Sequence, residues 1–294
     1  MAYLIPADYN KQIQDANLQQ IISNDTSVLN AAQLAAQAEA ISYLRQKYDT
    51  SKEFADLNVW SIAKTYYAGD RFYLNATAYS ATSTYALNAL TLYQNNVYKC
   101  TTAITVAEAF NPTKWLLLGY QYQIFSAVLP HNEFDYGGYY NVNDKVFWKN
   151  NVYDCLVQTP LLGHDTGIQY RNIDNLPLKN VAPDDPIEGK NYWGNKIAYS
   201  IPAGTLPTNT TYYAAADNRD QQMVMYFIDI TLYHVHTRIA PRNIPDIRVK
   251  RYDDAIAWLK MCANGDVTPN LPVIKPAQGR RIRYGGGIKL INSY

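Results

Sequence analysis

The 294-residue chain is poor in charge, because Asp, Glu, Lys and Arg make up 17% of its residues, against about 25% in an average protein. Its hydrophobic residues reach 48% and its aromatic residues 13%. This composition excludes an intrinsically disordered chain, which carries much charge and few aromatic residues. It also argues against a highly charged free monomer and favours a protein that buries surface against other chains.

Cysteine is scarce as well. Cys100, Cys155 and Cys262 form an odd set without a C-x-x-C pair, which argues against a disulfide framework and fits a reducing compartment. No hydrophobic run approaches the roughly 18 residues of a transmembrane helix. The start of the chain lacks a basic segment followed by a long apolar one. We therefore expect neither a membrane span nor a signal peptide.

The sequence patterns of common catalytic sites are also missing. There is no P-loop, no H-E-x-x-H and no G-x-S-x-G. His131, Glu133 and Asp135 alternate as ligands on a strand would, but a proline and two glycines bracket them and favour a solvated loop. His234 and His236 lie two apart on a predicted helix and therefore diverge. The sequence predicts no enzyme, no cofactor and no metal site.

Tyrosine is the abundant residue, with 27 copies. Its ring is apolar and its hydroxyl polar, so it is enriched on surfaces that are half buried against a partner. Most of the tyrosines lie in the middle of the chain, where many are expected to serve small cores and turns. Those on predicted helices, the better candidates for helix packing and subunit contacts, are Tyr48, Tyr226, Tyr233 and Tyr252.

Both ends of the chain have helical patterns. Helices are predicted over about 7–22, 28–48, 218–240 and 245–264, the last closed by Gly265. The second helix has apolar residues at spacings of three and four, which predict its buried face, and these are Leu34, Ala38, Ile41, Leu44 and Tyr48. Alanine is frequent in the same helix and allows close approach of another helix, within or between subunits.

Between about 58 and 213 the pattern changes to short β-type runs rich in Tyr, Val and Thr. The hexapeptide Asn95–Cys100 matches Asn150–Cys155, 55 residues further along. Each copy follows an apolar strand and an Asn-containing turn, and a tryptophan comes later. We therefore predict two small β modules in tandem.

Trp115, Trp148 and Trp193 admit two interpretations. If their faces are exposed, they offer flat platforms on which sugar rings or a partner stack. If they are buried, each fills the core of its own module, as a tryptophan often does in a unit of about 50–60 residues. We favour the core interpretation and keep the stacking interpretation open.

The last part of the chain differs in charge from the rest. No acidic residue follows Asp266, whereas five cationic residues do. Such a basic tail contacts nucleic acid, an acidic partner or solvent, and we favour solvent or a protein partner. Residues 274–294 are rich in Pro and Gly and are predicted to form an extended arm. The arm residues expected to contact a neighbouring protein are Lys275, Arg280, Arg281, Arg283, Ile288 and Leu290.

Together these patterns predict an α+β chain of four parts. Residues 1–58 and 214–273 form one discontinuous helical bundle. Residues 59–120 and 121–213 are the two inserted β modules, and residues 274–294 are the extended C-terminal arm.

The β modules resemble small chitin-binding-type carbohydrate-binding modules. That family's pattern is a Gly-Asp turn, an apolar strand, a turn with Asn or Gly, Val-Tyr-x-Cys and a later tryptophan. The first module carries it as Gly69-Asp70, Asn96–Cys100, Pro112 and Trp115, and the second as Asn143-Asp144, Asn151–Cys155 and Trp193. Both modules depart from the pattern by long inserts, at about 75–89 and 160–190. The resemblance implies a small β fold and a capacity to bind sugar.

The flanking helices resemble the head–tail connector (adaptor) proteins of tailed bacteriophages. The matching segments are Tyr3–Tyr9, Tyr43–Asp49, Asp229–Tyr233 with Arg238, Pro241 and Pro245, and Arg251–Leu259 with Gly265. The resemblance covers roughly 130 residues in the family's order, and the large insertion between the second and third helices departs from it. Family members assemble as a ring, usually of twelve, beneath the portal of the head, and grip neighbours with a C-terminal arm.

This resemblance implies a structural virion protein, a subunit of the neck ring that joins portal to tail. Its expected partners are further copies of itself in a ring of twelve, the portal protein, tail or other neck-ring proteins and a fibre or collar protein. DNA is expected to pass through the ring without specific recognition. The expected location is the virion neck, after synthesis in the host cytoplasm. The alternative function is a carbohydrate-binding protein that uses the aromatic β modules.

Overall fold

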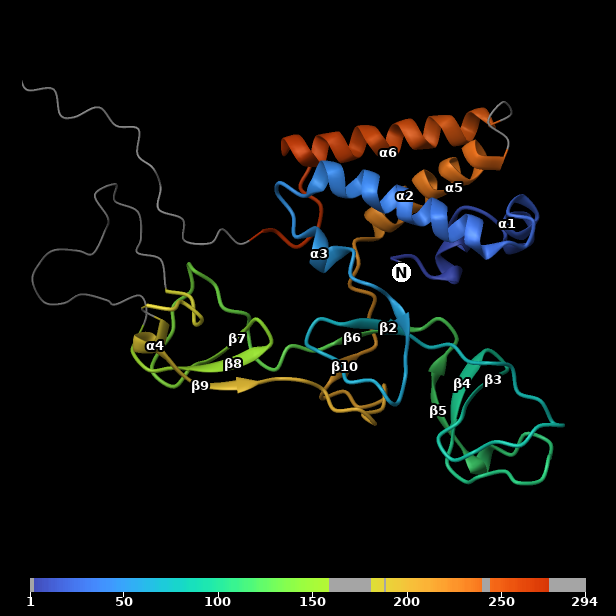
Figure 1. Cartoon of the computed structure of the whole chain (residues 1–294), viewed down its shortest axis with the longest axis horizontal. Coiled ribbons are helices and arrows are strands. Elements are labelled where there is room, and N and C mark those ends of the chain that lie inside the picture. Colours follow the sequence, from blue (N-terminus) through green and yellow to red (C-terminus); the bar gives the residue numbers. More distant parts are fainter. Residues whose placement is uncertain (1–2, 159–180, 188, 240–243, 275–294) are drawn as a thin grey trace, which may run out of the picture.

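The computed structural model describes residues 3–158, 181–187, 189–239 and 244–274 (Figure 1). Helices from both ends of the chain form one layer, and small β-sheets from the middle of the chain lie beneath it. The predicted α+β class is therefore confirmed. In the described part of the chain, the helices are too short or too polar to cross a bilayer.

The N-terminal helices begin with the 3-10 helix η1 (Pro6–Lys11), followed by α1 (Asp15–Ile21), α2 (Thr26–Leu44) and α3 (Thr50–Glu53). The prediction of one continuous helix over 7–22 was wrong, because the first part is a separate 3-10 turn. Pro6 opens this turn with its fixed φ. The side chain of Asp25 caps α2 by accepting the backbone N–H of Ser27 at 2.8 Å.

The C-terminal helices are α5 (Gln221–Ile239) and α6 (Asp246–Asn264). Gly265 ends α6 with a φ of 92° and donates its backbone N–H to the Met261 carbonyl, as predicted. This left-handed conformation suits glycine, which has no Cβ to clash.

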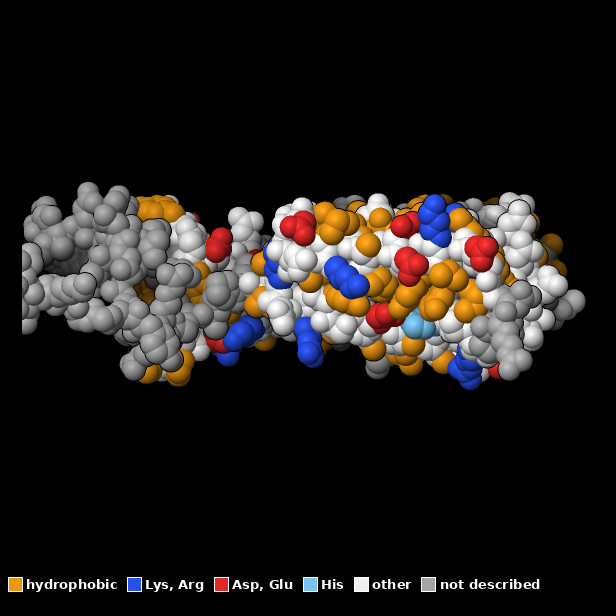
Figure 2. All heavy atoms as spheres, turned by 90° about the horizontal axis from the view of Figure 1, so that it is seen from above, with side chains coloured by type: hydrophobic (Ala, Val, Ile, Leu, Met, Phe, Trp, Pro, Cys, Tyr) orange, Lys and Arg blue, Asp and Glu red, His pale blue; other side chains and the backbone are white. Residues whose placement is uncertain are grey.

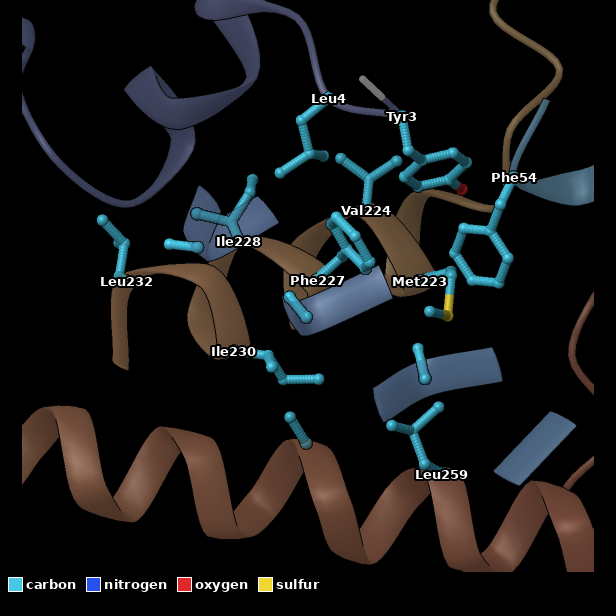
Figure 3. Close-up of a cluster of buried hydrophobic side chains, with 14 of the residues drawn as sticks. Tyr3, Leu4, Phe54, Met223, Val224, Phe227, Ile228, Ile230, Leu232 and Leu259 are labelled. Atoms are coloured by element: carbon cyan, nitrogen blue, oxygen red, sulfur yellow. The ribbon is translucent and has the colours of Figure 1, made fainter. Parts of the chain in front are cut away.

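Helix α5 is the centre of the helical core (Figure 3). It contacts α1, α2 and α6, and α2 also contacts α6. Its buried residues lie on most sides of the helix and include Val224, Phe227, Ile228, Leu232 and Val235.

The predicted buried face of α2 was right in its last part and wrong in its first. Leu44 and Tyr48 are each 1% exposed, and Ile41 packs against the same core. Leu34 is 54% exposed and Ala38 is exposed, whereas Ala32, Ala36 and Ala40 lie in the core at no more than 4% exposure. Alanines at intervals of four allow α5 to approach closely, since short side chains reduce the distance between helix axes. The larger apolar residue Leu34 therefore lies on the outer face.

Two of the sheets are antiparallel and have three strands each. The first consists of β3 (Leu90–Tyr93), β4 (Asn96–Cys100) and β5 (Trp115–Tyr120), and the short helix η2 (Pro112–Lys114) precedes β5. The second consists of β7 (Lys145–Trp148), β8 (Asn151–Cys155) and β9 (Trp193–Ala198), preceded by α4 (Gly189–Tyr192). Each copy of the hexapeptide repeat thus contains the middle strand of one sheet.

A further sheet, which the sequence did not predict, lies between these two and the helices (Figure 1). Its strands in order are β1 (Asn58–Val59), β2 (Arg71–Tyr73), β6 (Ile124–Ala127) and β10 (Tyr213–Ala214). The prediction of two tandem modules missed it because its strands are short and far apart in the sequence. The Gly69-Asp70 turn, expected in the first module, belongs to this central sheet.

The three sheets share one hydrogen-bonding pattern. A tyrosine hydroxyl accepts the backbone N–H of the residue five positions earlier, in the pairs Ser61–Tyr66, Ser80–Tyr85 and Asp135–Tyr140. A residue with positive φ donates its N–H to a strand carbonyl, in the pairs Gly69–Ala127, Asn88–Cys100 and Asn143–Cys155. The β3–β5 sheet lies in the chain between β2 and β6, and the β7–β9 sheet between β6 and β10. The β region therefore consists of three equivalent units. The central sheet is one of them, and the other two are inserted in the chain between its strands.

Candidate functional site

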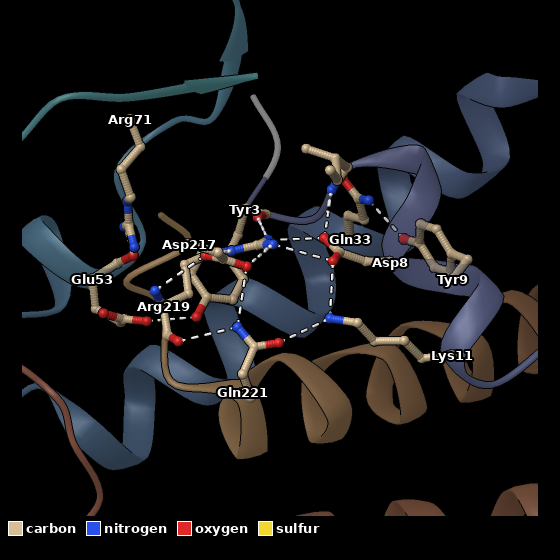
Figure 4. A network of polar contacts seen from close by, with 11 residues as sticks. Tyr3, Asp8, Tyr9, Lys11, Gln33, Glu53, Arg71, Asp217, Arg219 and Gln221 are labelled. Atoms are coloured by element: carbon tan, nitrogen blue, oxygen red, sulfur yellow. Dashed lines mark hydrogen bonds and ion pairs between the residues drawn. The ribbon is translucent and has the colours of Figure 1, made fainter. Parts of the chain in front are cut away.

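A buried polar network joins the N-terminal turn to the loop that enters α5 (Figure 4). Both NH groups of Arg219 bind the carboxylate of Asp8, at 2.8 and 3.1 Å, and NH2 also donates to Asp217 at 2.8 Å. Arg219 donates further to the backbone carbonyl of Tyr3 at 2.8 Å. Burial raises the pKa of Asp217, but hydrogen bonds and the charge of Arg219 outweigh it, so the net pKa lies below its ordinary value.

The same network continues to the central sheet. The Tyr3 hydroxyl donates to Glu53 at 2.5 Å, and the Arg71 guanidinium of β2 donates to the backbone carbonyls of Lys52 and Glu53. Burial raises the pKa of Glu53 above its ordinary value, against the opposing effects of Tyr3 and Arg71. These contacts hold the helical layer against the β region, which is a structural role.

The outer face of α2 is an exposed apolar surface. It contains Leu34 together with the exposed alanines Ala31, Ala35 and Ala38. The acidic residue of this helix, Glu39, is turned toward its neighbours instead: it accepts a hydrogen bond from Tyr252 at 2.6 Å and lies 2.9 Å from His234 Nε2. Figure 2 shows hydrophobic side chains among scattered charges across the helical face of the molecule. A surface of this kind suits contact with another chain.

A groove of about 320 Å³ lies between α5 and α6. Its walls include the aromatic residues Tyr226 and Trp258, whose ring centroids are 5.0 Å apart, and the exposed residues Ala257 and Met261. Asp229 also lines it, with a side chain only 7% exposed. Arg251 and Asp254 complete the lining, so the groove combines apolar walls with charged side chains of both signs.

Trp115 and Trp193 occupy equivalent core positions. Trp115 is 6% exposed and packs edge-on against Tyr79 and Tyr85, while Trp193 is 3% exposed and packs edge-on against Phe134 and Tyr140. Their register partners in the middle strands are Cys100 and Cys155. These two tryptophans have the core role that the sequence favoured, and their faces are not open to a ligand.

Trp148 is different, because it is only half-buried and lines a cleft of about 1100 Å³ beneath the helical layer. Its Nε1 donates to Asp184 at 2.6 Å. The equivalent residue of the β3–β5 unit is Tyr93, and there Phe110 stacks on the ring at a centroid distance of 3.9 Å. Among the described residues, no aromatic ring stacks on Trp148 in this way.

The cleft beside Trp148 has both apolar and polar walls, and Leu129, Phe147 and Leu271 are among its apolar residues. The side chains that line it with hydrogen-bonding groups include Asp49, Lys52, Asp70, Glu133, Asn150, Asn218 and Asn270. Tyr67 adds a second exposed aromatic ring, and Lys52 and Glu133 form an ion pair at 3.5 Å. Neither the cleft nor the α5–α6 groove was predicted, because each is lined by residues distant in the sequence.

The remaining predicted site residues have varied outcomes. The arm residues Lys275, Arg280, Arg281, Arg283, Ile288 and Leu290 lie outside the described residues. The described residues contain no group of three or more His, Cys, Asp or Glu side chains able to hold a metal ion. His234 and His236 both lie on α5, as predicted.

Comparison with known proteins identifies no family for this chain: no family model matches it, and no protein with curated annotation does.

Proposed function

We propose that this chain is a structural virion protein, a subunit of the neck ring that joins portal to tail. The observation that carries the proposal is the exposed apolar face of α2, with Leu34 among Ala31, Ala35 and Ala38. Permanent assemblies bury surfaces of this composition, because the apolar area lost from water stabilises the contact. The low overall charge and the resemblance of the flanking helices to connector proteins support the same function.

In this proposal the helices from both chain ends form one discontinuous bundle that builds the ring, and the β units project outward.

 Those units are proposed to dock fibre or collar proteins. The ring is proposed to have twelve subunits and to surround the DNA channel without specific DNA recognition. The basic arm, residues 274–294, is proposed to contact the portal or a neighbouring subunit.

Mass photometry of the purified chain, alone and mixed with the portal protein of the same particle, tests this function. We expect a ring-sized species that forms or is stabilised when the portal is present. A chain that stays monomeric and ignores the portal would refute the proposal. Replacing Arg280, Arg281 and Arg283 by Gln is expected to weaken portal binding while the circular dichroism spectrum stays helical.

A second candidate function is carbohydrate binding, and Trp148 is the observation that favours it. Its ring lines the large cleft and lacks the stacked ring that covers Tyr93 in the equivalent unit. Sugar rings stack their CH faces on aromatic rings, and the carboxylates and amides of the cleft suit their hydroxyl groups.

An array of β-linked hexose and N-acetylhexosamine oligomers tests this second function. We expect binding by the wild-type chain, loss of binding in Trp148→Ala, and retained binding in Tyr93→Ala, whose ring is already covered. Absence of binding by the wild-type chain, or equal loss in both variants, would count against it.

A further inference from the structure

The edge strand β5 exposes apolar side chains and an open row of backbone groups. It is the last strand of its sheet, and from Trp115 to Tyr120 it contains no charged residue and no proline. Leu116, Leu117 and Tyr120 are 39%, 48% and 59% exposed. Proteins protect such edges with charged side chains, proline or a covering segment, because the free N–H and C=O groups of an edge strand bind other strands. In the described part of the chain, no backbone group outside this sheet hydrogen-bonds to residues 116–119.

The equivalent edge strand of the other three-stranded sheet is protected. β9 has the same place in its sheet and a similar register shift against its middle strand. It carries the exposed residues Asn195 and Lys196, and the side chain of Asn195 donates to Asp154 at 2.8 Å. The fold of the unit therefore does not require an apolar edge. The apolar residues of β5 indicate that this edge contacts a further segment.

A groove of about 340 Å³ lies along the same edge. Residues 117–119 of β5 line it, and so do several residues of the 207–215 segment. Successive side chains of a strand point to opposite faces, and β4 occupies the other edge of β5. A hollow that touches three residues in a row therefore lies beside the open edge. Phe125 and Tyr213 add apolar wall, so the groove suits one extended apolar segment.

We propose that residues 288–291 of the arm of one copy of this chain add as a further strand to the β5 edge of the next copy. This inference rests on the proposed function, because it names the surface that receives the arm of a neighbouring subunit. The added strand satisfies the open N–H and C=O groups of β5, and its apolar side chains enter the groove beside it.

The arm contains a sequence that suits this edge. Residues 288–291 are Ile-Lys-Leu-Ile, and three glycines precede them. In an extended strand, Ile288 and Leu290 point to one face and Lys289 points to the other. The two apolar side chains can therefore enter the groove while the lysine keeps its charge in water. The glycines have no Cβ and let the chain turn before the added strand.

The start of the arm and the β5 edge lie on different sides of the β region. Ile274, after which the arm begins, lines the cleft together with Phe147 and Trp148 of β7. The β7–β9 sheet and the β3–β5 sheet lie on opposite sides of the central sheet (Figure 1). This placement favours the β5 of a neighbour over the arm's own. Contact between two different surfaces repeats from copy to copy, and it closes into a ring when the rotation between copies allows.

Cross-linking between two separately purified variants of the full chain, Leu117→Cys and Leu290→Cys, tests the inference. The variants are mixed before the portal is added, and a short bismaleimide is expected to join them once they assemble. The native cysteines are all buried, and the wild type shows their background. Ile197→Cys, 59% exposed on the equivalent strand β9, replaces Leu117→Cys as the matched control and is expected to give at least tenfold less product.

Substitutions that close the edge give a second readout. Leu117→Lys gives β5 a protecting charge like that of β9, and it is expected to weaken assembly at least tenfold by mass photometry. Leu290→Pro is expected to do the same, because proline lacks the N–H that a strand donates. Leu290→Val and Leu87→Lys, the latter at a residue 57% exposed outside the strands of the same unit, are expected to assemble as the wild type does.

Assembly of the wild type without the 117–290 cross-link would overturn the inference and leave the ring proposal standing. The same holds if the cross-link forms only within one chain that carries both cysteines, or if two Leu117→Cys chains are joined to each other instead. A wild-type chain that stays monomeric with the portal present would overturn both.

Discussion

Arg219 and Asp8 form a buried ion pair although they lie 211 positions apart in the sequence. The Arg219 side chain is 1% exposed and that of Asp8 is 4% exposed. Asp217 and the Tyr3 carbonyl accept the remaining donors of the guanidinium. The N-terminal turn and the loop before α5 are therefore held together by a fully hydrogen-bonded charge.

Replacing Arg219 by Met is expected to destabilise the chain by about 3–5 kcal/mol, because two carboxylates are left without their buried partner. Denaturant unfolding followed by circular dichroism measures this loss. Lys11→Met is the matched control, since Lys11 pairs with the same Asp8 at 3.2 Å from a side chain 36% exposed. Its cost is expected to stay within about 1 kcal/mol, and equal costs for the two variants would contradict the assignment.

Glu53 is expected to make stability fall as the pH rises. Burial raises its pKa above the ordinary value of 4.5, so the folded chain holds the proton more tightly than the unfolded chain. The resulting stability is fully present below pH 4.5 and is lost as the pH rises through the raised pKa of the folded state. The wild type should therefore lose stability relative to Glu53→Gln as the pH rises from 4.5 to neutral. Denaturant titrations of both proteins across this range measure the difference in their free energies of unfolding.

Asp217 provides a control of opposite sign for this pH dependence. Its folded-state pKa lies below the ordinary 3.8 because Arg219 outweighs the effect of burial. The stability that it contributes is present above pH 3.8 and is lost as the pH falls through the lowered pKa. The free energy of unfolding of Asp217→Asn should therefore be furthest below that of the wild type near neutral pH, and the difference should shrink as the pH falls. A constant difference for both variants across the pH range would refute the two assignments.

Neighbouring alanines of α2 are expected to respond differently to the same substitution. Ala36 is 0% exposed in the helical core, whereas Ala35 is exposed. Ala36→Leu should cost about 1–3 kcal/mol because the core has no space for the added atoms. Ala35→Leu should change the stability by no more than about 0.5 kcal/mol. Denaturant unfolding of the two variants at low protein concentration checks this. Similar losses of stability in both variants would contradict the assignment of Ala36 to the buried face of α2 and Ala35 to the exposed face.

The β3–β4 and β7–β8 hairpin turns are expected to be equally sensitive to substitution of their second asparagine-type turn position, Asn95 in one and Asn150 in the other. Asn95 and Asn150 have φ values of 61° and 60°, a left-handed conformation that asparagine tolerates and valine does not. Asn150→Val should cost about 1–2 kcal/mol, and Asn95→Val should cost the same within error. Glycine at either position should be tolerated, since it has no Cβ. Thermal unfolding compares the four variants, and a large difference between the two sites would contradict the equivalence of the units.

Much of the local structure could be predicted from local signals. The turn at Asn150 follows from residues that accept positive φ between two apolar runs. The end of α6 at Gly265 follows from the glycine that its last turn needs. The inner face of α2 could have been found by reading Ala32, Ala36 and Ala40 as a stripe, but alanine contributes too little hydrophobicity to outweigh Leu34 in a periodicity argument.

Composition and short-range patterns thus account for the α+β class, the terminal helices and the repeated hairpins, because each depends on residues within a few positions of one another. Long-range packing accounts for the rest. The central sheet joins β2 to β6 and β6 to β10 across the nested units, and the Arg219–Asp8 pair joins the two ends of the helical layer. Which face is buried in the first part of α2 was likewise settled by how closely α5 approaches it, because the short side chains of Ala32, Ala36 and Ala40 give only a weak hydrophobic signal in the sequence.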